Sequence, residues 1–333
     1  MTKSATREAA DKVTFTQAEV TAKDTAARAG RKNLIINGDN RISQRGTYTS
    51  ALDFVHNQYH FDRWKSNKAG GSIDGTIVQS SATIDGAICI TQLYTVTTGS
   101  ASSYIGAHQK LEFPETFIGR TVTISAWVKS NTTTARLQIY NQASGGNATI
   151  AVDTHTGGGA WEYLTATGTV LAGTTALSLF VATLTEAAGT LTTVTGDYIE
   201  FTNVQMELGP VATDFEHRSY GEILADCQRY FQIISGGGDA FTFTGKGQGG
   251  TVIDGTIPLS VSLRASPTMS NVNSRAFGDS GTFATSSSTP VPNQFVAGDI
   301  ALAFQCGGFS GLTNNEIYVW GPVSSVLTLD AEL

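Results

Sequence analysis

The chain has 333 residues, of which 40% are hydrophobic and only 15% are charged, whereas about 25% of the residues of an average globular domain carry a charge. Its formal net charge of -7 argues against a nucleic-acid-binding protein, which needs a basic surface to displace counterions. No run of 18 apolar residues is present, so we expect no membrane insertion. The length fits two domains, and 36 glycines among many threonines and serines favour short strands and turns.

Residues 1–32 differ in composition from the rest of the chain. They contain seven basic and four acidic side chains, a net charge of +3, and few apolar residues. Such a segment cannot bury enough apolar surface to fold alone. Two interpretations remain open, a disordered leader and a tail or helix that docks on partner proteins. The segment has no apolar stretch typical of a secretion signal, so we expect synthesis in a cytoplasm, with Cys89, Cys227 and Cys306 reduced and buried.

From residue 33 the pattern changes to short strands separated by glycine and asparagine clusters. Val122, Ile124, Ala126 and Val128 alternate with polar residues, and residues 137–140, 177–181 and 198–208 form similar runs. Many short strands of this kind are typical of β-sandwiches and jelly rolls. We therefore predict a jelly-roll domain over 33–218 and a second β-sandwich domain over 235–333.

One segment after the leader is predicted to be helical. Ser219 is followed three residues later by Glu222, which is the spacing of a capping box. Ile223, Cys227 and Tyr230 then recur on one helical face. The predicted fold is thus all-β, with two jelly-roll-like sandwiches joined by a short helix over 219–234 and a charged N-terminal tail or helix over 1–32.

An Asp-Gly pair occurs three times between isoleucines. The three copies lie at 73–77, 84–88 and 253–257. Aspartate tolerates a positive φ and glycine adopts it freely, which suits the tight turn of a β-hairpin. We predict a hairpin turn at each copy.

Three stretches together resemble tail-fibre and virion structural proteins of tailed bacteriophages. The first is Asn33-Leu34-Ile35-Ile36-Asn37-Gly38-Asp39 with Arg41-Ile42-Ser43-Gln44-Arg45-Gly46, followed by Phe61-Asp62-Arg63-Trp64. The second is Val204-Gln205-Met206-Glu207-Leu208-Gly209-Pro210-Val211-Ala212-Thr213. The third is Phe215-Glu216-His217-Arg218-Ser219-Tyr220-Gly221-Glu222, followed by Cys227-Gln228-Arg229-Tyr230-Phe231. The resemblance covers about residues 33–232. It implies a structural subunit of a virion, usually a homotrimer, made in the host cytoplasm.

The first domain also resembles the jelly-roll carbohydrate-binding modules of secreted glycosidases. Those modules often hold a structural calcium between the opening strand and acidic residues near the last strand. By that resemblance the residues expected to hold calcium are Asn37, Asp39 and Asn203. Thr202 and Asn203 stand where the modules have an acidic pair, and this departure puts the calcium site in doubt.

The sequence contains none of the catalytic patterns that we searched for. Gly308-Phe309-Ser310-Gly311-Leu312 lacks the final glycine of a nucleophile elbow. His56 and His60 are four residues apart, a spacing that aligns ligands only on a helix, and this segment is predicted to be loop and strand. Glu112 and Glu115 flank Pro114, and Glu200 and Glu207 lie on or near a predicted strand, but neither pair has a sequence spacing that indicates the two carboxylates of a glycosidase. We therefore predict a protein that is not an enzyme.

Aromatic side chains are the candidates for sugar binding, because pyranose rings stack on exposed aromatic rings. Tyr140, Trp161 and Trp320 are the residues that we select, with a core position as the alternative for each. The predicted function is that of a phage tail, head or collar fibre that docks through 1–32 and contacts host surface polysaccharide. The alternative is a cellular carbohydrate-binding module or adhesin.

Overall fold

The computed structural model describes residues 31–69, 72–101, 103–183, 192–235, 243–270, 274–278, 283–286, 288, 290–294, 300–322 and 326–333. These residues belong to two compact units. The first comprises residues 31–39 together with the described parts of Thr49–Asn57 and Ser66–Glu216, and the second comprises Asn40–Tyr48, Gln58–Lys65 and the described parts of His217–Leu333. Asn40–Tyr48 and Gln58–Lys65, which lie within the jelly-roll domain predicted over 33–218, therefore belong to the second unit. The leader 1–32 lies outside the described residues, except for Arg31 and Lys32.

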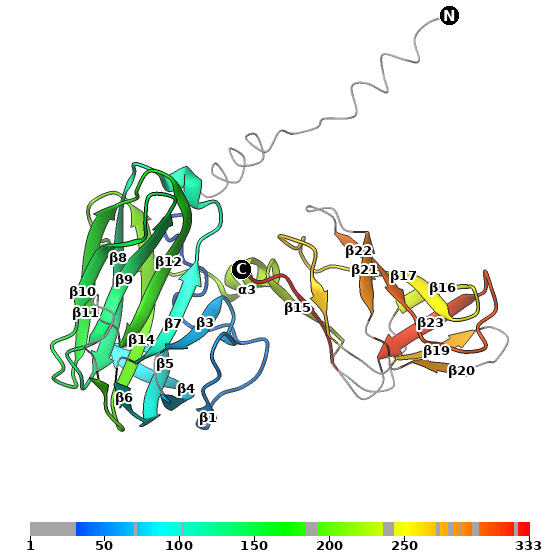
Figure 1. Ribbon diagram of the computed structural model, residues 1–333, viewed down its shortest axis with the longest axis horizontal. Coiled ribbons are helices and arrows are strands. Elements are labelled where there is room, and N and C mark those ends of the chain that lie inside the picture. Colours follow the sequence, from blue (N-terminus) through cyan, green and yellow to red (C-terminus); the bar gives the residue numbers. More distant parts are fainter. Residues whose placement is uncertain are drawn as a thin grey trace, which may run out of the picture. The chain divides into compact units, whose positions relative to one another are not determined.

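Two six-stranded antiparallel sheets contain most strands of the first unit, which is the green and cyan body of Figure 1. In sheet I the strand order is β1 (Leu52–Asp53), β4 (Asp74–Ile84), β5 (Ala87–Thr98), β14 (Tyr198–Leu208), β8 (Thr121–Ser130) and β11 (Trp161–Thr169). In sheet II it is β10 (Ala148–Thr154), β9 (Ala135–Ala143), β12 (Thr174–Thr183), β7 (Tyr104–Lys110), β3 (Trp64–Ala69) and β2 (Tyr59–Phe61). The short strands β6 (Ser100–Ala101) and β13 (Thr192–Thr193) pair separately, and a 3-10 turn covers Pro114–Phe117.

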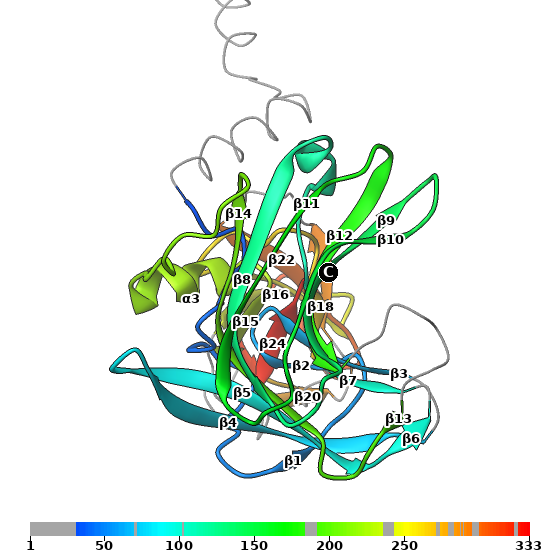
Figure 2. The same cartoon turned by 90° about the vertical axis from the view of Figure 1, so that its left-hand side faces the viewer.

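The core of this unit lies between the two sheets, which Figure 2 shows from a second direction. The predicted alternation on β8 is confirmed, because Val122, Ile124, Ala126 and Val128 are each 0% exposed. Leu137 and Ile139 on β9 are equally buried. Each aliphatic side chain of this size contributes about 1.5–3 kcal/mol by leaving water. The inward faces thus hold the sandwich together, and the outward faces are left for other roles.

The Asp-Gly copies have two different structures. Asp85 and Gly86 form the turn between β4 and β5, with φ of 51° and 81°, so this hairpin prediction is confirmed. The other two predictions are wrong, because Asp74-Gly75 lies within β4 and Asp254-Gly255 lies within β17 (Val252–Pro258). A Cβ on Gly75 would come within 2.4 Å of Ile105 Cδ1, and one on Gly255 within 2.6 Å of the Phe304 ring. At these two positions glycine permits close packing.

The second unit contains a helix and two further antiparallel sheets; the helix is shorter than the predicted 219–234, because the chain from Phe231 onward pairs as a strand. The helix α3 spans Tyr220–Gln228, and both hydrogen bonds of the Ser219–Glu222 capping box are present. The smaller sheet has the order β15 (Phe231–Ser235), β24 (Leu327–Asp330) and β18 (Thr268–Met269). The larger has the order β20 (Phe283–Ser286), β19 (Ser274–Gly278), β23 (Ile317–Pro322), β16 (Phe243–Gln248), β17, β22 (Ala301–Cys306) and β21 (Val291–Gln294). The all-β fold prediction is confirmed.

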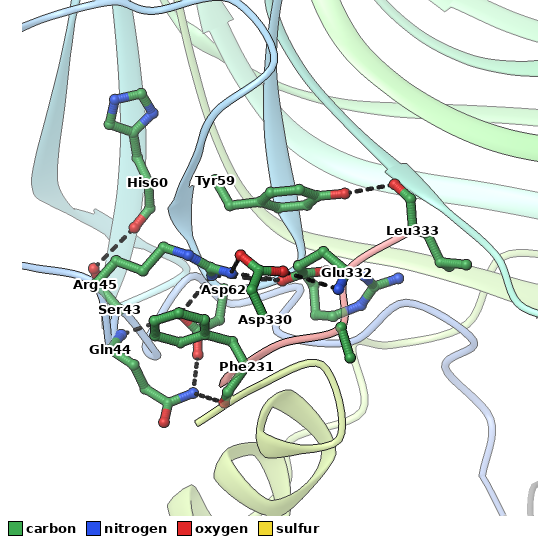
Figure 3. A network of polar contacts seen from close by, with 12 residues as sticks. Ser43, Gln44, Arg45, Tyr59, His60, Asp62, Phe231, Asp330, Glu332 and Leu333 are labelled. Atoms are coloured by element: carbon green, nitrogen blue, oxygen red, sulfur yellow. Dashed lines mark hydrogen bonds and ion pairs between the residues drawn. The ribbon is translucent and has the colours of Figure 1, made fainter. Parts of the chain in front are cut away.

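A buried charge network ties early segments of the chain to its last residues within the second unit (Figure 3). Arg63, 2% exposed, pairs with Glu332, and its guanidinium carbon lies 3.5 Å from the centroid of the Tyr230 ring. Arg45 Nη2 lies 3.1 Å from Asp330 Oδ2, and Arg45 Nη1 lies 3.6 Å from Asp62 Oδ1. The second unit therefore depends on residues from both ends of the described chain. No helix among the described residues has the length and apolar character needed to cross a membrane.

Candidate functional site

The outward face of sheet II is lined by polar and aromatic side chains. Alternation along β9 directs Leu137 and Ile139 into the core and leaves Arg136, Gln138 and Tyr140 on the outward side. Hydrogen-bond register then sets which residues of the neighbouring strands lie beside them. We call this outward surface, with the residues given below, the sheet II face.

The strand registers arrange the sheet II face in three rows. Tyr140 lies opposite Ser178, which lies opposite Lys110. The second row contains Val152, Gln138, Phe180 and His108, and the third contains Thr154, Arg136, Ala182 and Gly106. In the third row Arg136 lies between Thr154 and the small residue Ala182, and Gly106 follows on β7.

Three rings form the centre of the sheet II face. Phe180 is half-buried, and its ring stacks on the His108 imidazole with centroids 4.8 Å apart and an angle of 21° between the planes. The half-buried Tyr140 meets Phe180 edge to face at 6.2 Å. These distances are typical of favourable aromatic pairs, which fix the rings in place. A rigid apolar surface of this kind suits the flat face of a sugar ring.

A polar chain extends from His108 to the next strand. Asn67 Nδ2 lies 3.3 Å from His108 Nδ1, and the Tyr104 hydroxyl donates to Asn67 Oδ1 at 3.3 Å. Burial raises the pKa of Tyr104, the hydrogen bond with Asn67 opposes this rise, and Tyr140 adds to it. Tyr104 therefore remains a neutral hydrogen-bonding group at physiological pH.

Two side chains of the sheet II face have polar atoms that are buried without a hydrogen-bond partner among the described residues. They are Gln138 Oε1 and the Nε and Nη1 atoms of Arg136. An unsatisfied buried polar group costs about 1–3 kcal/mol, and more when it is charged. The sheet II face therefore places the half-buried Arg136 near its rings, with the largely buried Gln138 in the row between Arg136 and Tyr140.

The three aromatic residues selected from the sequence lie in three different environments. Tyr140 belongs to the sheet II face. Trp161 is half-buried on β11, with its side chain on the outward side of sheet I. Trp320 is 0% exposed and packs against Phe304 at 4.7 Å in the core of the second unit. The ring-stacking prediction for Trp320 is wrong, because its ring has no surface that a ligand could reach.

Sequence reasoning missed Arg136, Gln138, Phe180 and His108. They stand at the polar or outward positions of runs that were recognised as strands, for example Arg136-Leu137-Gln138-Ile139-Tyr140. The alternation therefore contained part of the signal. What the sequence lacked was the pairing of β9 with β12 and of β12 with β7, which brings these positions together.

The residues expected to hold calcium lie in segments that meet, since Val204 N donates to Gly38 O at 2.9 Å. A Cβ on Gly38 would lie 2.0 Å from Val204 O, so glycine is required for this approach. Asn37 and Asp39 are buried, and Asn203 Nδ2 points to the Cys89 thiol at 3.6 Å. Calcium takes six to eight oxygen ligands, and this spot offers one carboxylate beside a sulfur atom. The calcium site at Asn37, Asp39 and Asn203 therefore stays a prediction.

The remaining reactive side chains are the three cysteine thiols, which are buried in the fold. Cys89, Cys227 and Cys306 are all buried, as expected. Burial raises the pKa of the Cys89 thiol and, more strongly, that of Cys227, which opposes thiolate formation. Across the described ranges, no group of three or more histidine, cysteine, aspartate or glutamate side chains is arranged to hold a metal ion.

Comparisons with known proteins found similar folds only. No protein-family model matches the sequence, and the search of curated proteins gave no significant match. Solved structures similar to this chain include the enzymatically active domain of tailspike protein 4 from bacteriophage CBA120, at 16% identity and a TM-score of 0.34, over 53% of this chain and 21% of that one.

Two structures that contain carbohydrate-binding modules are also similar. The paired module and catalytic domain of a Clostridium thermocellum xylanase match at 18% identity and a TM-score of 0.32, over 52% of this chain and 30% of that one. The xylan-binding domain of a Paenibacillus barcinonensis xylanase matches at 15% identity and a TM-score of 0.30, over 50% and 99%. At these values no function follows from the likeness.

Proposed function

We propose that this chain is a non-catalytic glycan-binding protein that binds its ligand on the sheet II face. The observation that carries the proposal is the position of the half-buried Arg136 on the same outward sheet face as the half-buried rings of Phe180 and Tyr140. Rings supply contact area, while the amide and guanidinium groups fix the orientation of a bound sugar.

The charges of the sheet II face indicate an acidic glycan. Its three rows include the cations Lys110 and Arg136 and no carboxylate, on a chain whose formal net charge is -7. A guanidinium binds a carboxylate or phosphate in a bidentate manner. We infer that the preferred ligand is a polysaccharide that contains uronic acid, sialic acid or phosphate groups, and that binding weakens as salt increases.

The larger context that we propose is a bacteriophage particle, in which this chain is a structural subunit of a fibre. Support comes from the sequence stretches at 33–39, 61–64 and 204–220. In a homotrimer each subunit would present a sheet II face, so weak single contacts would add through avidity. Residues 1–32 would attach the fibre to other virion proteins. A cellular module or adhesin is the alternative, and a monomer in solution would favour it.

Glycan arrays with and without acidic sugars test the binding proposal. We expect acidic polysaccharides to bind and Arg136→Ala to weaken binding at least tenfold, because a hydrogen bond to a charged group contributes about 1.5–3 kcal/mol. Thr256→Ala, at an exposed position of β17, is the matched control and should bind normally. Unchanged binding by Arg136→Ala and Gln138→Ala would contradict the site, and release of reducing sugar from the bound glycan would contradict the absence of catalysis.

A further inference from the structure

The outward side of sheet I has its own group of aromatic side chains. Register places Trp161 on β11 beside Lys129 on β8, and Lys129 beside Glu200 on β14. The next row places Tyr163 beside Trp127, and Trp127 beside Thr202. We call Trp161, Tyr163, Trp127, Lys129 and Glu200 the sheet I platform. It lies on the opposite sheet from Arg136 and shares no residue with the sheet II face.

The rings of the sheet I platform are accessible. Tyr163 is 43% exposed, and Trp127 and Trp161 are half-buried. The Trp127 and Tyr163 rings lie 5.4 Å apart at an angle of 50°, so they support each other. Large aromatic side chains usually bury their apolar surface. Three of them at adjacent surface positions form a stacking surface that the fold itself does not need.

Lys129 and Glu200 place a donor and an acceptor beside these rings. Lys129 Nζ lies 3.9 Å from Glu200 Oε2, which is longer than a hydrogen bond. The other carboxylate oxygen, Oε1, accepts a hydrogen bond from the Thr91 hydroxyl at 2.6 Å, so the carboxylate is held in position. The Lys129 side chain is 35% exposed and that of Glu200 is 9% exposed, so Lys129 is the accessible member of the pair and Glu200 holds it in position.

Another part of sheet I is covered by the chain itself. Gln205 Nε2 donates to Thr213 O at 3.2 Å, and Thr213 N donates to Glu207 at 2.9 Å. Thr123 donates to Gly209 O at 2.7 Å. The segment after β14 therefore covers the rows of Ser125 and Thr123, whereas Tyr163, in the row of Trp127, is 43% exposed.

We infer that the sheet I platform is a second glycan-binding site, which takes a neutral pyranose chain. The aromatic rings would stack on the apolar face of a sugar, and the paired cation and anion would donate to and accept from adjacent hydroxyls. Because Lys129 and Glu200 carry one positive and one negative charge, the sheet I platform favours a ligand without net charge. The sheet II face, by contrast, is cationic. The inference extends the proposed function to a second site, and each site can be tested without the other.

Quenching of tryptophan fluorescence by a soluble quencher reports on the sheet I platform. Trp64 and Trp320 are each 0% exposed, so a soluble quencher such as acrylamide reaches only Trp127 and Trp161 among the four tryptophans. Both belong to the platform, and the sheet II face contains no tryptophan. We would titrate the full chain with cellohexaose, xylohexaose and laminarihexaose as probes and measure acrylamide quenching at each concentration.

We expect at least one of the three neutral hexasaccharides to protect the fluorescence from acrylamide. Tyr163→Ala and Lys129→Met should each raise the concentration needed for half-protection at least fivefold, with melting temperatures near that of the unchanged chain. Arg136→Ala is the matched control, because it alters the sheet II face and should leave this protection unchanged. A separate measurement of acidic-glycan binding by Arg136→Ala tests the sheet II face.

Three results would overturn the inference. The first is the absence of protection by all three hexasaccharides. The second is protection that Arg136→Ala removes and Tyr163→Ala retains, which would locate the neutral ligand on the sheet II face. The third is a change in oligomer size on chromatography of Tyr163→Ala or Lys129→Met, which would assign the platform to contacts between copies of the chain.

Discussion

His60 and Asp62 are buried titratable residues whose pKa values move in opposite directions. Burial lowers the pKa of His60 from its usual 6.5, and the nearby Arg45 cation lowers it further. Burial raises the pKa of Asp62 above 3.8, although hydrogen bonds from Gln44 oppose this rise. Each change favours the neutral form of its group in the folded state. The second unit is therefore sensitive to pH through both residues.

The folded chain should lose stability as the pH falls below about 6.5, because the unfolded chain then binds a proton at His60 that the folded chain excludes. The loss should stop below the lowered pKa, where both states are protonated. Replacing His60 with Phe should reduce the difference in unfolding free energy between pH 7.5 and 5.5. Each tenfold difference in proton affinity between the folded and unfolded chain corresponds to about 1.4 kcal/mol. Urea denaturation at the two pH values measures the change.

His217→Phe removes an exposed imidazole and is the matched control for this experiment. Asp62 acts in the opposite sense, since stability rises as the pH falls through its raised pKa toward 3.8, so the comparison stays above pH 5. An equal pH dependence in His60→Phe and in the unchanged chain would show that His60 is not responsible.

At the scale of secondary-structure elements, α3 shows how hydrogen bonds between neighbouring residues determine where a helix begins. The Ser219 side chain accepts a hydrogen bond from Glu222 N, and the Glu222 carboxylate accepts one from Ser219 N at 3.0 Å. These contacts satisfy two backbone donors at the start of the helix. Ile223 and Cys227 on the buried side then fix the helix to the rest of the second unit.

Ser219→Ala should lower the unfolding free energy by about 1 kcal/mol, because a backbone donor at the start of the helix loses its acceptor. Glu222→Gln is the comparison variant, since glutamine also completes a capping box, and it should cost less. Chemical denaturation followed by far-ultraviolet circular dichroism measures both. A larger loss for Glu222→Gln than for Ser219→Ala would contradict the capping explanation.

The sequence predicted the secondary-structure elements better than it predicted which strands pair with one another. Period-two alternation identified β8, β12 and β14, and the cap spacing located α3, because these signals lie within about ten residues. The sheet II face could not be predicted, since Arg136, His108 and Phe180 become neighbours only through pairing across strands. The same limit explains Trp320, because alternation shows two sides of a strand without showing which one is buried.

At the scale of the whole molecule, the second unit is discontinuous in sequence. It needs Asn40–Tyr48 and Gln58–Lys65 as well as His217–Leu333. Gln44 Nε2 donates to Phe231 O at 2.9 Å, and Arg63 neutralises the buried Glu332. A domain boundary drawn at a single point near residue 218 would therefore separate residues that one core requires.

A fragment with residues 217–333 alone should fail to unfold cooperatively. Without Arg63, the carboxylate of Glu332 would lose its buried partner, and breaking such a pair costs about 3–5 kcal/mol out of a total stability of about 5–15 kcal/mol. Calorimetry of the fragment and of the full chain makes the comparison. Arg63→Met in the full chain should lower the melting temperature while keeping a cooperative transition, because the other contacts of both segments remain. A fragment that melts cooperatively at the temperature of the full chain would show that the second unit folds without the two early segments.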